Sequence, residues 1–177
     1  MTDPSTAPSI EDLSPGRYLL DPTKSQVHYS GKHMFGMGTV HAVFTIGEGE
    51  LRIGEPMATS SATVTVAAGS FNSNNARRDK DVRSAGLLDV ERYPAIIFAS
   101  NGLRATRDGW LVTGTVTARG HTVPVDVRID RVTHEGAGIR VQGRADRLDR
   151  TAFGITGSRG MVGRYLDLEL DAFATAG

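Results

Sequence analysis

The side chains best suited to acid–base or hydrogen-bonding chemistry are His33, Arg78, Asp79, Arg83 and Arg150. A carboxylate or an imidazole can transfer protons, and a guanidinium donates paired hydrogen bonds to a carbonyl or a phosphate. Catalysis needs at least two such groups close to one substrate. Asp79, His33 and Arg150 are therefore the acid–base candidates if the protein is an enzyme. The alternative is a solvated ion-pair network that fixes a helix, which the spacing of four residues between Asp79 and Arg83 favours.

Metal and nucleophile chemistry has no recognisable motif in this sequence. No two histidines stand at helical spacing, and the chain has no cysteine, which excludes disulfides, thiolate metal sites and a thiol nucleophile. No nucleophile elbow, phosphate-binding loop or dinucleotide fingerprint occurs either. We therefore predict no metal site, no catalytic cofactor and no catalytic residue. The histidines are His28, His33, His41, His121 and His134.

The charge and the hydrophobicity of the sequence limit the classes of partner that we expect. Twenty basic residues balance twenty acidic ones in a chain of 177 residues, so no field of one sign attracts nucleic acid. No apolar run approaches the roughly 18 residues of a membrane-spanning helix, which predicts no stable membrane insertion. Residues 1–15 are rich in Pro, Ser, Thr and Asp and lack the features of a secretory signal. We expect them to form a disordered tail on a cytoplasmic protein.

The elements that must position these side chains are strands. From Arg17 onward apolar and polar residues alternate, which places alternate side chains on opposite faces of a strand. Arg119-Gly120 predicts a hairpin turn, while Gly114 and Gly143 on apolar faces predict strong bending or open interior space. Nine or ten strands with one apolar face close into a barrel or pack as two sheets. The predicted strands cover residues 17–20, 26–32, 39–46, 51–53, 61–66, 95–103, 112–118, 122–129, 139–145 and 166–172.

One segment departs from the strand pattern. Residues 74–84 predict a short helix with Asn74 as its N-cap, and the irregular stretch that follows contains Leu87, Leu88 and Tyr93. The helix offers only Val82 to an apolar core, so it is expected to lie over one end of the barrel. The three apolar residues after it are expected to plug that end.

Five stretches, in this order and spacing, resemble the YceI-like family of lipocalin-type polyisoprenoid-binding proteins, over residues 18–173. The resemblance implies an all-β fold: a single extended antiparallel lipocalin-like barrel over residues 16–177, with a short helix and loop covering one end. The stretches are Leu20-Asp-Pro-Thr-Lys-Ser-Gln-Val27 with Lys32-His33; Arg78-Asp79 with Arg83-Ser84; Tyr93-Pro-Ala-Ile-Ile-Phe-Ala-Ser100; Gly114-Thr-Val-Thr-Ala-Arg-Gly-His-Thr-Val-Pro-Val125; and Arg150-Thr-Ala-Phe-Gly-Ile155.

The resemblance also implies a ligand: a polyprenyl lipid or the tail of an isoprenoid quinone, carried or stored inside the barrel. A barrel of about eight strands with small inward side chains has room for one slender chain. The alternatives are an enzyme that acts on an apolar substrate in the same cavity, and a structural or adaptor domain with a filled interior. The predicted ligand contacts are Val27, Phe44, Val64, Ile96, Phe98, Val112, Val116, Val125, Val127, Leu168 and Phe153, with His33, Arg78, Asp79 and Arg150 as polar contacts.

Two further expectations concern access and assembly. Residues 74–94 and 150–163 are the long interruptions of the strand pattern, and we expect them to form a gate at one barrel end. In the strand over residues 95–103, Ile96, Phe98 and Ser100 are expected to point inward. Ile97 and Ala99 then point outward and favour a homodimer contact.

Overall fold

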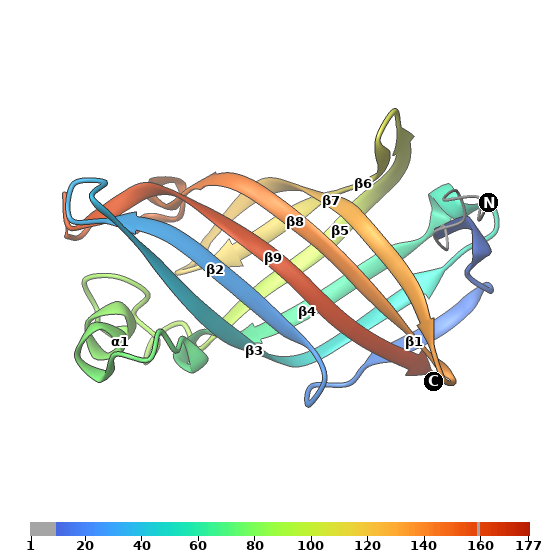
Figure 1. Ribbon diagram of the computed structural model, residues 1–177, viewed down its shortest axis with the longest axis horizontal. Helices are drawn as coiled ribbons and strands as arrows, with labels where there is room; N and C mark the ends of the chain where they lie inside the picture. Colours follow the sequence, from blue (N-terminus) through green and yellow to red (C-terminus); the bar gives the residue numbers. More distant parts are fainter. Residues whose placement is uncertain (1–9, 159) are drawn as a thin grey trace, which may run out of the picture.

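A computed structural model describes residues 10–158 and 160–177, which form an elongated antiparallel barrel (Figure 1). The elements are η1 (Ile10–Asp12), β1 (Gly16–Leu20), β2 (Gln26–His33), β3 (Gly38–Ile53), η2 (Met57–Thr59), β4 (Ser61–Ala67), η3 (Ala68–Ser70), α1 (Ala76–Arg83), β5 (Ala95–Thr106), β6 (Gly109–Ala118), β7 (His121–Glu135), β8 (Gly138–Asp149), η4 (Arg150–Phe153) and β9 (Val162–Ala176).

The sheet closes on itself because β3 is long enough to pair with three strands, β1, β2 and β4. The hydrogen-bonded order is β1-β3-β2-β9-β8-β7-β6-β5-β4, and β3 pairs again with β4. A register shift between Ile46 and Glu48 bends β3 from β2 toward β4. The sequence divided this strand into two, at residues 39–46 and 51–53; the intervening Gly-Glu-Gly reads as a turn but continues the ladder. The predicted antiparallel barrel is confirmed.

The period-two pattern identified the inner face correctly. Ile96 and Phe98 line the interior, whereas Ile97 is exposed on the outside. The predicted turn at Arg119-Gly120 joins β6 to β7, with both residues in the left-handed region (φ 49° and 73°). Alternation therefore fixed which side chains face inward, because the pleat leaves only two faces.

Mid-strand glycines permit close packing here, which corrects the expectation of open space. A Cβ on Gly114 would lie 2.5 Å from the Ala99 carbonyl oxygen. A Cβ on Gly143 would lie 2.9 Å from the Arg128 carbonyl oxygen. Neighbouring backbone therefore occupies the space that a side chain would need.

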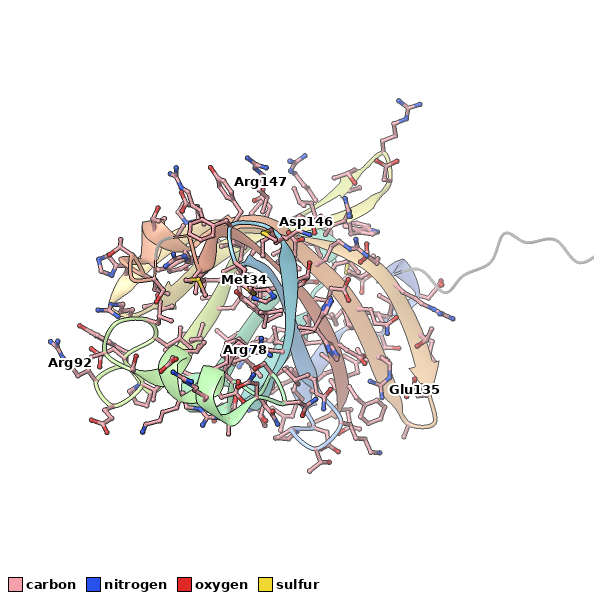
Figure 2. All side chains as sticks on the ribbon, turned by 60° about the vertical axis from the view of Figure 1, so that its left-hand side comes forward. Met34, Arg78, Arg92, Glu135, Asp146 and Arg147 are labelled. Carbon is pink, nitrogen blue, oxygen red and sulfur yellow. The ribbon has the colours of Figure 1, made fainter. Side chains whose placement is uncertain are left out.

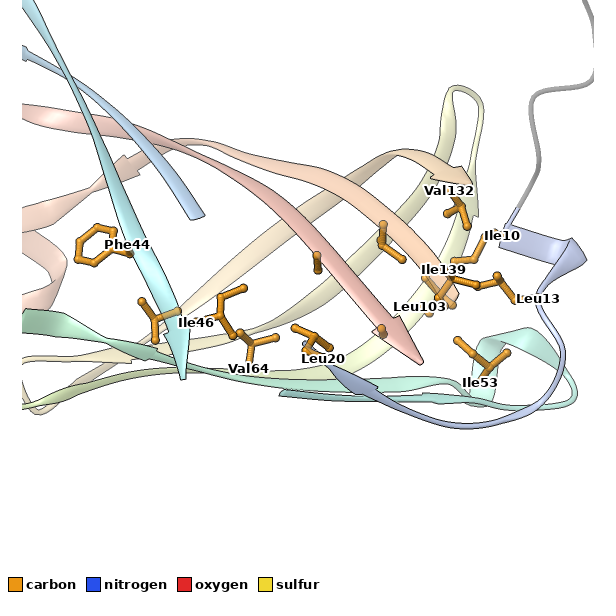
Figure 3. Packing of buried hydrophobic residues seen from close by; sticks show 14 of the residues in the cluster. Ile10, Leu13, Leu20, Phe44, Ile46, Ile53, Val64, Leu103, Val132 and Ile139 are labelled. Atoms are coloured by element: carbon orange, nitrogen blue, oxygen red, sulfur yellow. The ribbon is translucent and has the colours of Figure 1, made fainter. Parts of the chain in front are cut away.

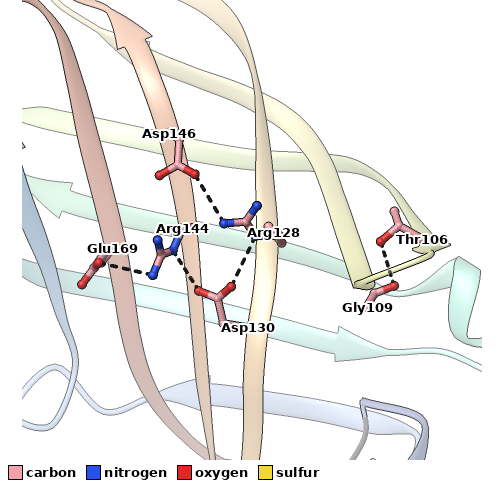
Figure 4. Close-up of polar contacts among 7 residues, drawn as sticks. All are labelled: Thr106, Gly109, Arg128, Asp130, Arg144, Asp146 and Glu169. Atoms are coloured by element: carbon pink, nitrogen blue, oxygen red, sulfur yellow. Dashed lines mark hydrogen bonds and ion pairs between the residues drawn. The ribbon is translucent and has the colours of Figure 1, made fainter.

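Charged side chains cover the outer wall and pair across strands (Figure 4). Arg144 on β8 bonds Asp130 on β7 at 3.2 Å and lies 3.7 Å from Glu169 on β9. The hydrogen bond to Asp130 is the main reason that the pKa of Arg144 is raised. Arg128 pairs with Asp130 and with Asp146 in the same row. Acidic and basic side chains on this part of the outer wall are thus paired within and across strands, which suits a solvated face.

The N-terminal segment differs from the expectation of a tail through residue 15. Ile10–Asp12 form a 3-10 helix, and the side chains of Ile10 and Leu13 are buried at one end of the barrel (Figure 3). Their burial removes apolar surface from water. The local sequence did not predict it, because the two residues stand in a polar segment. Residues 1–9 of the predicted tail, and residue 159 of the predicted gate, lie outside the described residues.

Candidate functional site

An apolar cavity runs inside the barrel. It encloses about 170 Å³, and nearly all of its wall is aliphatic or aromatic. One water-sized atom needs roughly 10–15 Å³ of such volume, so the cavity has room for about a dozen non-hydrogen atoms. The polar residues on its wall are Ser60, Ser61, Ser100 and Arg144. Three of the four are hydroxyls, and the guanidinium of Arg144 is engaged on the outer wall, so the interior offers an apolar chain few competing polar contacts.

Nine of the fifteen predicted contacts belong to this wall. They come from β2, β4, β5, β6, β7 and β9. That they contact a ligand remains a prediction. These nine residues are Val27, Val64, Ile96, Phe98, Val112, Val116, Val125, Val127 and Leu168.

Phe44 and Phe153 are buried but are not on the cavity wall. The Phe44 ring lies 5.3 Å from the ring of Phe71, which also packs edge-on against Tyr29 at 5.4 Å. Burial raises the pKa of the Tyr29 hydroxyl. Phe71 follows η3 and enters the barrel from outside the strand pattern, so periodicity did not anticipate that it would fill the space beside Phe44.

Arg78 and Asp79 hold helix α1 in place through Ser73. The buried Asp79 carboxylate accepts hydrogen bonds from the Ser73 amide at 3.0 Å and its hydroxyl at 2.5 Å. Arg78 Nε donates to the same hydroxyl at 2.9 Å. The expected Asp79–Arg83 pair does not form: Arg83 donates instead to the Phe71 carbonyl at 2.7 Å. The anchoring role was anticipated, but its hydrogen bonds are buried rather than solvated.

The N-cap of α1 also lies one residue later than expected. The Asn75 side chain accepts from the Arg78 amide at 3.0 Å, whereas Asn74 is in the left-handed region with φ 58°. Both residues are asparagine, so their types alone could not decide which would cap the helix.

Arg150 fastens the loop that precedes β9. Its buried guanidinium donates to the carbonyls of Ile155, Gly157, Val162 and Gly163, at 2.8 to 3.0 Å. Charge-assisted bonds of this kind are stronger than neutral ones. His33 lies at the far end of β2, with its ring over Gly38. Neither residue is on the cavity wall, so the three acid–base candidates do not converge there.

One end of the barrel is closed by the two segments predicted to cover it. Leu87 packs in one buried cluster with Phe153 and Ile155, and Leu88 contacts the same cluster. Tyr93 lies against the β6–β7 turn, where its ring is 3.1 Å from an ideal Cβ on Gly120. The predicted cover is therefore present at this end. That these segments open as a gate remains a prediction.

The opposite end is closed by residues that sequence reasoning missed. Ile10 and Leu13 reach the cavity wall together with Leu20, Ile53 and Leu103 (Figure 3). The apolar residues at the strand ends were visible in the sequence, but the two N-terminal ones stood in a polar context. Two apolar side chains three residues apart, as in one turn of helix, were the available signal.

Asp149 provides a pH-dependent contact beside the covered end. It accepts from the Thr151 amide at 2.9 Å and pairs with Arg164 at 2.8 Å. The Arg164 hydrogen bond is the largest cause that lowers the pKa of Asp149 to about 2, from 3.8. A lowered folded-state pKa contributes stability above the unfolded pKa and loses it as pH falls through the folded one.

We expect Asp149→Asn to lower the free energy of unfolding at pH 7 by less than about 1 kcal/mol, since the pair is partly solvated. Asparagine keeps the oxygen that Thr151 uses. The difference from the unsubstituted protein should be constant above about pH 5 and vanish as the pH approaches 2. Urea titrations across this range measure it. Arg164→Gln should give the same profile, and a loss that persists at pH 2 in either variant contradicts the assignment.

No group of three His, Cys, Asp or Glu side chains suited to a metal ion occurs within residues 10–158 and 160–177. In the same described part of the chain, the helices are too short or too polar to span a membrane.

Known proteins share this sequence and this fold. Residues 18–174 match the model of the YceI-like domain. A UPF0312 protein of Pseudomonas putida is 31% identical over 163 residues, covering 82% of each chain, and one of Enterobacter sp. is 27% identical over 150 residues, covering 80% of this chain and 76% of its own.

Two solved structures superpose on the barrel. Burkholderia cenocepacia BcnA has a TM-score of 0.74 at 25% identity, over 88% of this chain and 99% of its own. A polyisoprenoid binding domain from Saccharophagus degradans has a TM-score of 0.68 at 15% identity, over 90% and 98%. The match of the family model to nearly the whole barrel decides the membership: the chain belongs to the YceI-like family.

Proposed function

We propose that the protein binds an isoprenoid chain inside its barrel and carries or stores it without chemical change. The observation that carries this proposal is the apolar cavity of about 170 Å³ within a closed sheet. A structural or adaptor domain would have a filled interior. The likeness in fold to the polyisoprenoid binding domain from S. degradans supports the same ligand class.

The energetics suit an apolar chain of moderate length. About a dozen buried carbons at ~0.8 kcal/mol each give a gross gain of about 10 kcal/mol, against association costs of at least about 4. The remainder of at most about 6 kcal/mol corresponds to a dissociation constant of about 50 µM or weaker. The cavity as it stands therefore suits about two or three isoprene units.

Native mass spectrometry of the protein purified from its own cells tests the proposal. We expect a co-purified isoprenoid, whose mass also identifies the head group: quinone, phosphate or alcohol. Protein that carries no lipid, and gains none from farnesol-length or geranylgeraniol-length probes, contradicts it. A product altered in its covalent structure after incubation favours the enzyme alternative instead.

The two buried N-terminal side chains should set the length of the bound chain. Ile10→Ala with Leu13→Ala removes volume comparable to about one isoprene unit from the end of the cavity. We expect the preferred prenyl alcohol to become about one unit longer, as measured by isothermal titration with a length series. Leu19→Ala removes an exposed side chain from β1 and serves as the control. An unchanged length preference in the double variant would show that this end does not limit the ligand.

Location and assembly complete the proposal. We infer a cytoplasmic carrier, which fractionation of the native cells tests. Ile97 is exposed on the outer wall, which supports the homodimer expectation, and light scattering after gel filtration measures the mass in solution.

A further inference from the structure

Two loops that are far apart in the sequence form one apolar tip at the barrel end covered by Leu87 and Phe153. The β2–β3 turn supplies Met34, Phe35 and Met37, and the loop before β9 supplies Met161. Their backbones pair: Met34 N donates to the Met161 carbonyl at 3.1 Å, and Phe35 N donates to the Gly160 carbonyl at 2.5 Å. In Figure 1 this tip is at the left, where β2, β3 and β9 meet. We call Met34, Phe35, Met37 and Met161 the apolar tip.

The side chains of the apolar tip face solvent to an unusual degree. Phe35 is 79% exposed and Met37 is 85% exposed, although each could lower its free energy by burial. Met34 and Phe35 also occupy left-handed backbone positions (φ 51° and 58°) in this four-residue turn, a conformation that is uncommon for large side chains. The fold thus keeps large apolar side chains at the outermost point of a strained turn, which indicates a contact made there.

The chemistry around the tip fits a bilayer surface. Neither loop contains an acidic residue; Lys32 lies two residues before Met34, and Arg164 lies three residues after Met161. Arg147 on the same rim lies 4.2 Å from the centre of the Tyr165 ring (Figure 2). Apolar residues at a tip, with aromatic and cationic residues behind them, match the order of acyl chains, interface and phosphates in a membrane. Asp149 neutralises Arg164, so the apolar contribution should dominate over the charge.

The tip can enter the membrane interface without exposing unpaired backbone N–H groups. The amides of Met34, Phe35, Gly36 and Met37 all donate to backbone carbonyls, three of them within the two loops and one, that of His33, at the end of β2. Unsatisfied backbone groups are what makes most loops costly to insert into lipid. The tip projects outward from the end of the barrel, a shape that suits a fluid surface better than a protein groove.

The tip is also joined to the cover of the cavity. Val162 follows Met161 in the chain and packs against the cluster of Leu87, Phe153 and Ile155. A movement of the tip on contact with a bilayer would therefore be transmitted to the segments that close this end. We propose that the apolar tip docks the protein on a phospholipid bilayer, from which the ligand passes into the barrel. This deepens the proposed function and rests on it.

Co-sedimentation with vesicles of phosphatidylglycerol and phosphatidylcholine tests the docking. We expect Phe35→Ser with Met37→Ser to lower the partition coefficient about tenfold or more. The control is Leu19→Ser, which removes an exposed apolar side chain (39%) elsewhere on the barrel and should bind vesicles normally. Equal loss in the tip variant and the control, or no vesicle binding by the unsubstituted protein, overturns the proposal. Dimerisation through the tip without vesicle binding also overturns it.

The depth to which the apolar tip enters the bilayer can be measured with a single tryptophan, because Trp110 is the sole tryptophan of the protein and can be replaced. In a Trp110→Phe background, the fluorescence of Phe35→Trp should be quenched by brominated acyl chains, and that of Leu19→Trp should not.

Ligand binding in the absence of vesicles separates the docking proposal from the proposed function. The tip variant should bind a soluble prenyl analogue like the unsubstituted protein, and its uptake of that analogue from donor vesicles should be at least about tenfold slower. If the analogue binds in solution but its uptake from vesicles does not depend on the tip, only the docking proposal is contradicted. If no variant binds the analogue at all, the proposed function is contradicted.

Discussion

Filling the middle of the cavity should abolish ligand binding while leaving the barrel folded. Val112 and Val127 are register partners on β6 and β7, and both are on the cavity wall. Val112→Phe with Val127→Phe adds roughly eight carbon atoms to a space for about a dozen non-hydrogen atoms. We expect at least about a 100-fold loss of affinity for a farnesol-length probe, measured by isothermal titration. The melting temperature of the ligand-free protein should fall little, since the new rings occupy existing space.

The same hairpin provides a control pair on its outer face. Thr117 and Thr122 are also register partners, and their hydroxyls lie 2.8 Å apart outside the barrel. Thr117→Phe with Thr122→Phe makes a similar change in size without entering the cavity, so its affinity should equal that of the unsubstituted protein. Unchanged binding in the Val112 and Val127 variant would place the ligand elsewhere. If that double variant does not fold, Val112→Phe alone tests the same point with a smaller expected loss.

Replacing Arg150 should produce the largest loss of stability. Its side chain is buried, with 4% of the residue exposed, and donates to four backbone carbonyls, two in the loop before β9 and two at the start of β9. Arg150→Met keeps the aliphatic stem and leaves those acceptors without their donor. We expect the free energy of unfolding in urea to fall by about 3–5 kcal/mol. Limited proteolysis should then cut within residues 155–163 before the rest of the barrel.

Arg164→Met is the matched comparison, because Arg164 is nearby, pairs with Asp149 and has a side chain that is 60% exposed. It should cost less than about 1 kcal/mol. Arg150→Lys should be intermediate, since one ammonium group cannot reach all four carbonyls in place of a planar guanidinium. Equal losses in the Arg150 and Arg164 variants would show that the burial of Arg150 does not matter.

The sequence by itself determined where most of the strands run, the inward face of the clearly alternating strands, and nine residues of the cavity wall. Val112, Val116, Val125 and Val127 could be assigned because a pleated strand has only two faces and the cavity lies on the apolar one. The Arg119-Gly120 turn was likewise set locally, since Gly120 tolerates its left-handed conformation. Information of this kind is contained within about ten consecutive residues.

Only the tertiary structure decided how the barrel ends are closed and what is exposed there. Ile10 and Leu13 are buried because strand ends distant in the sequence form a wall around them, and Phe71 enters the interior beside Phe44 for the same reason. The roles of Arg150 and of the apolar tip depend on which distant carbonyls and loops are brought alongside. The local sequence around an arginine or a methionine does not show whether its side chain is buried or exposed. The difference arises from partners supplied by long-range packing, which local periodicity does not encode.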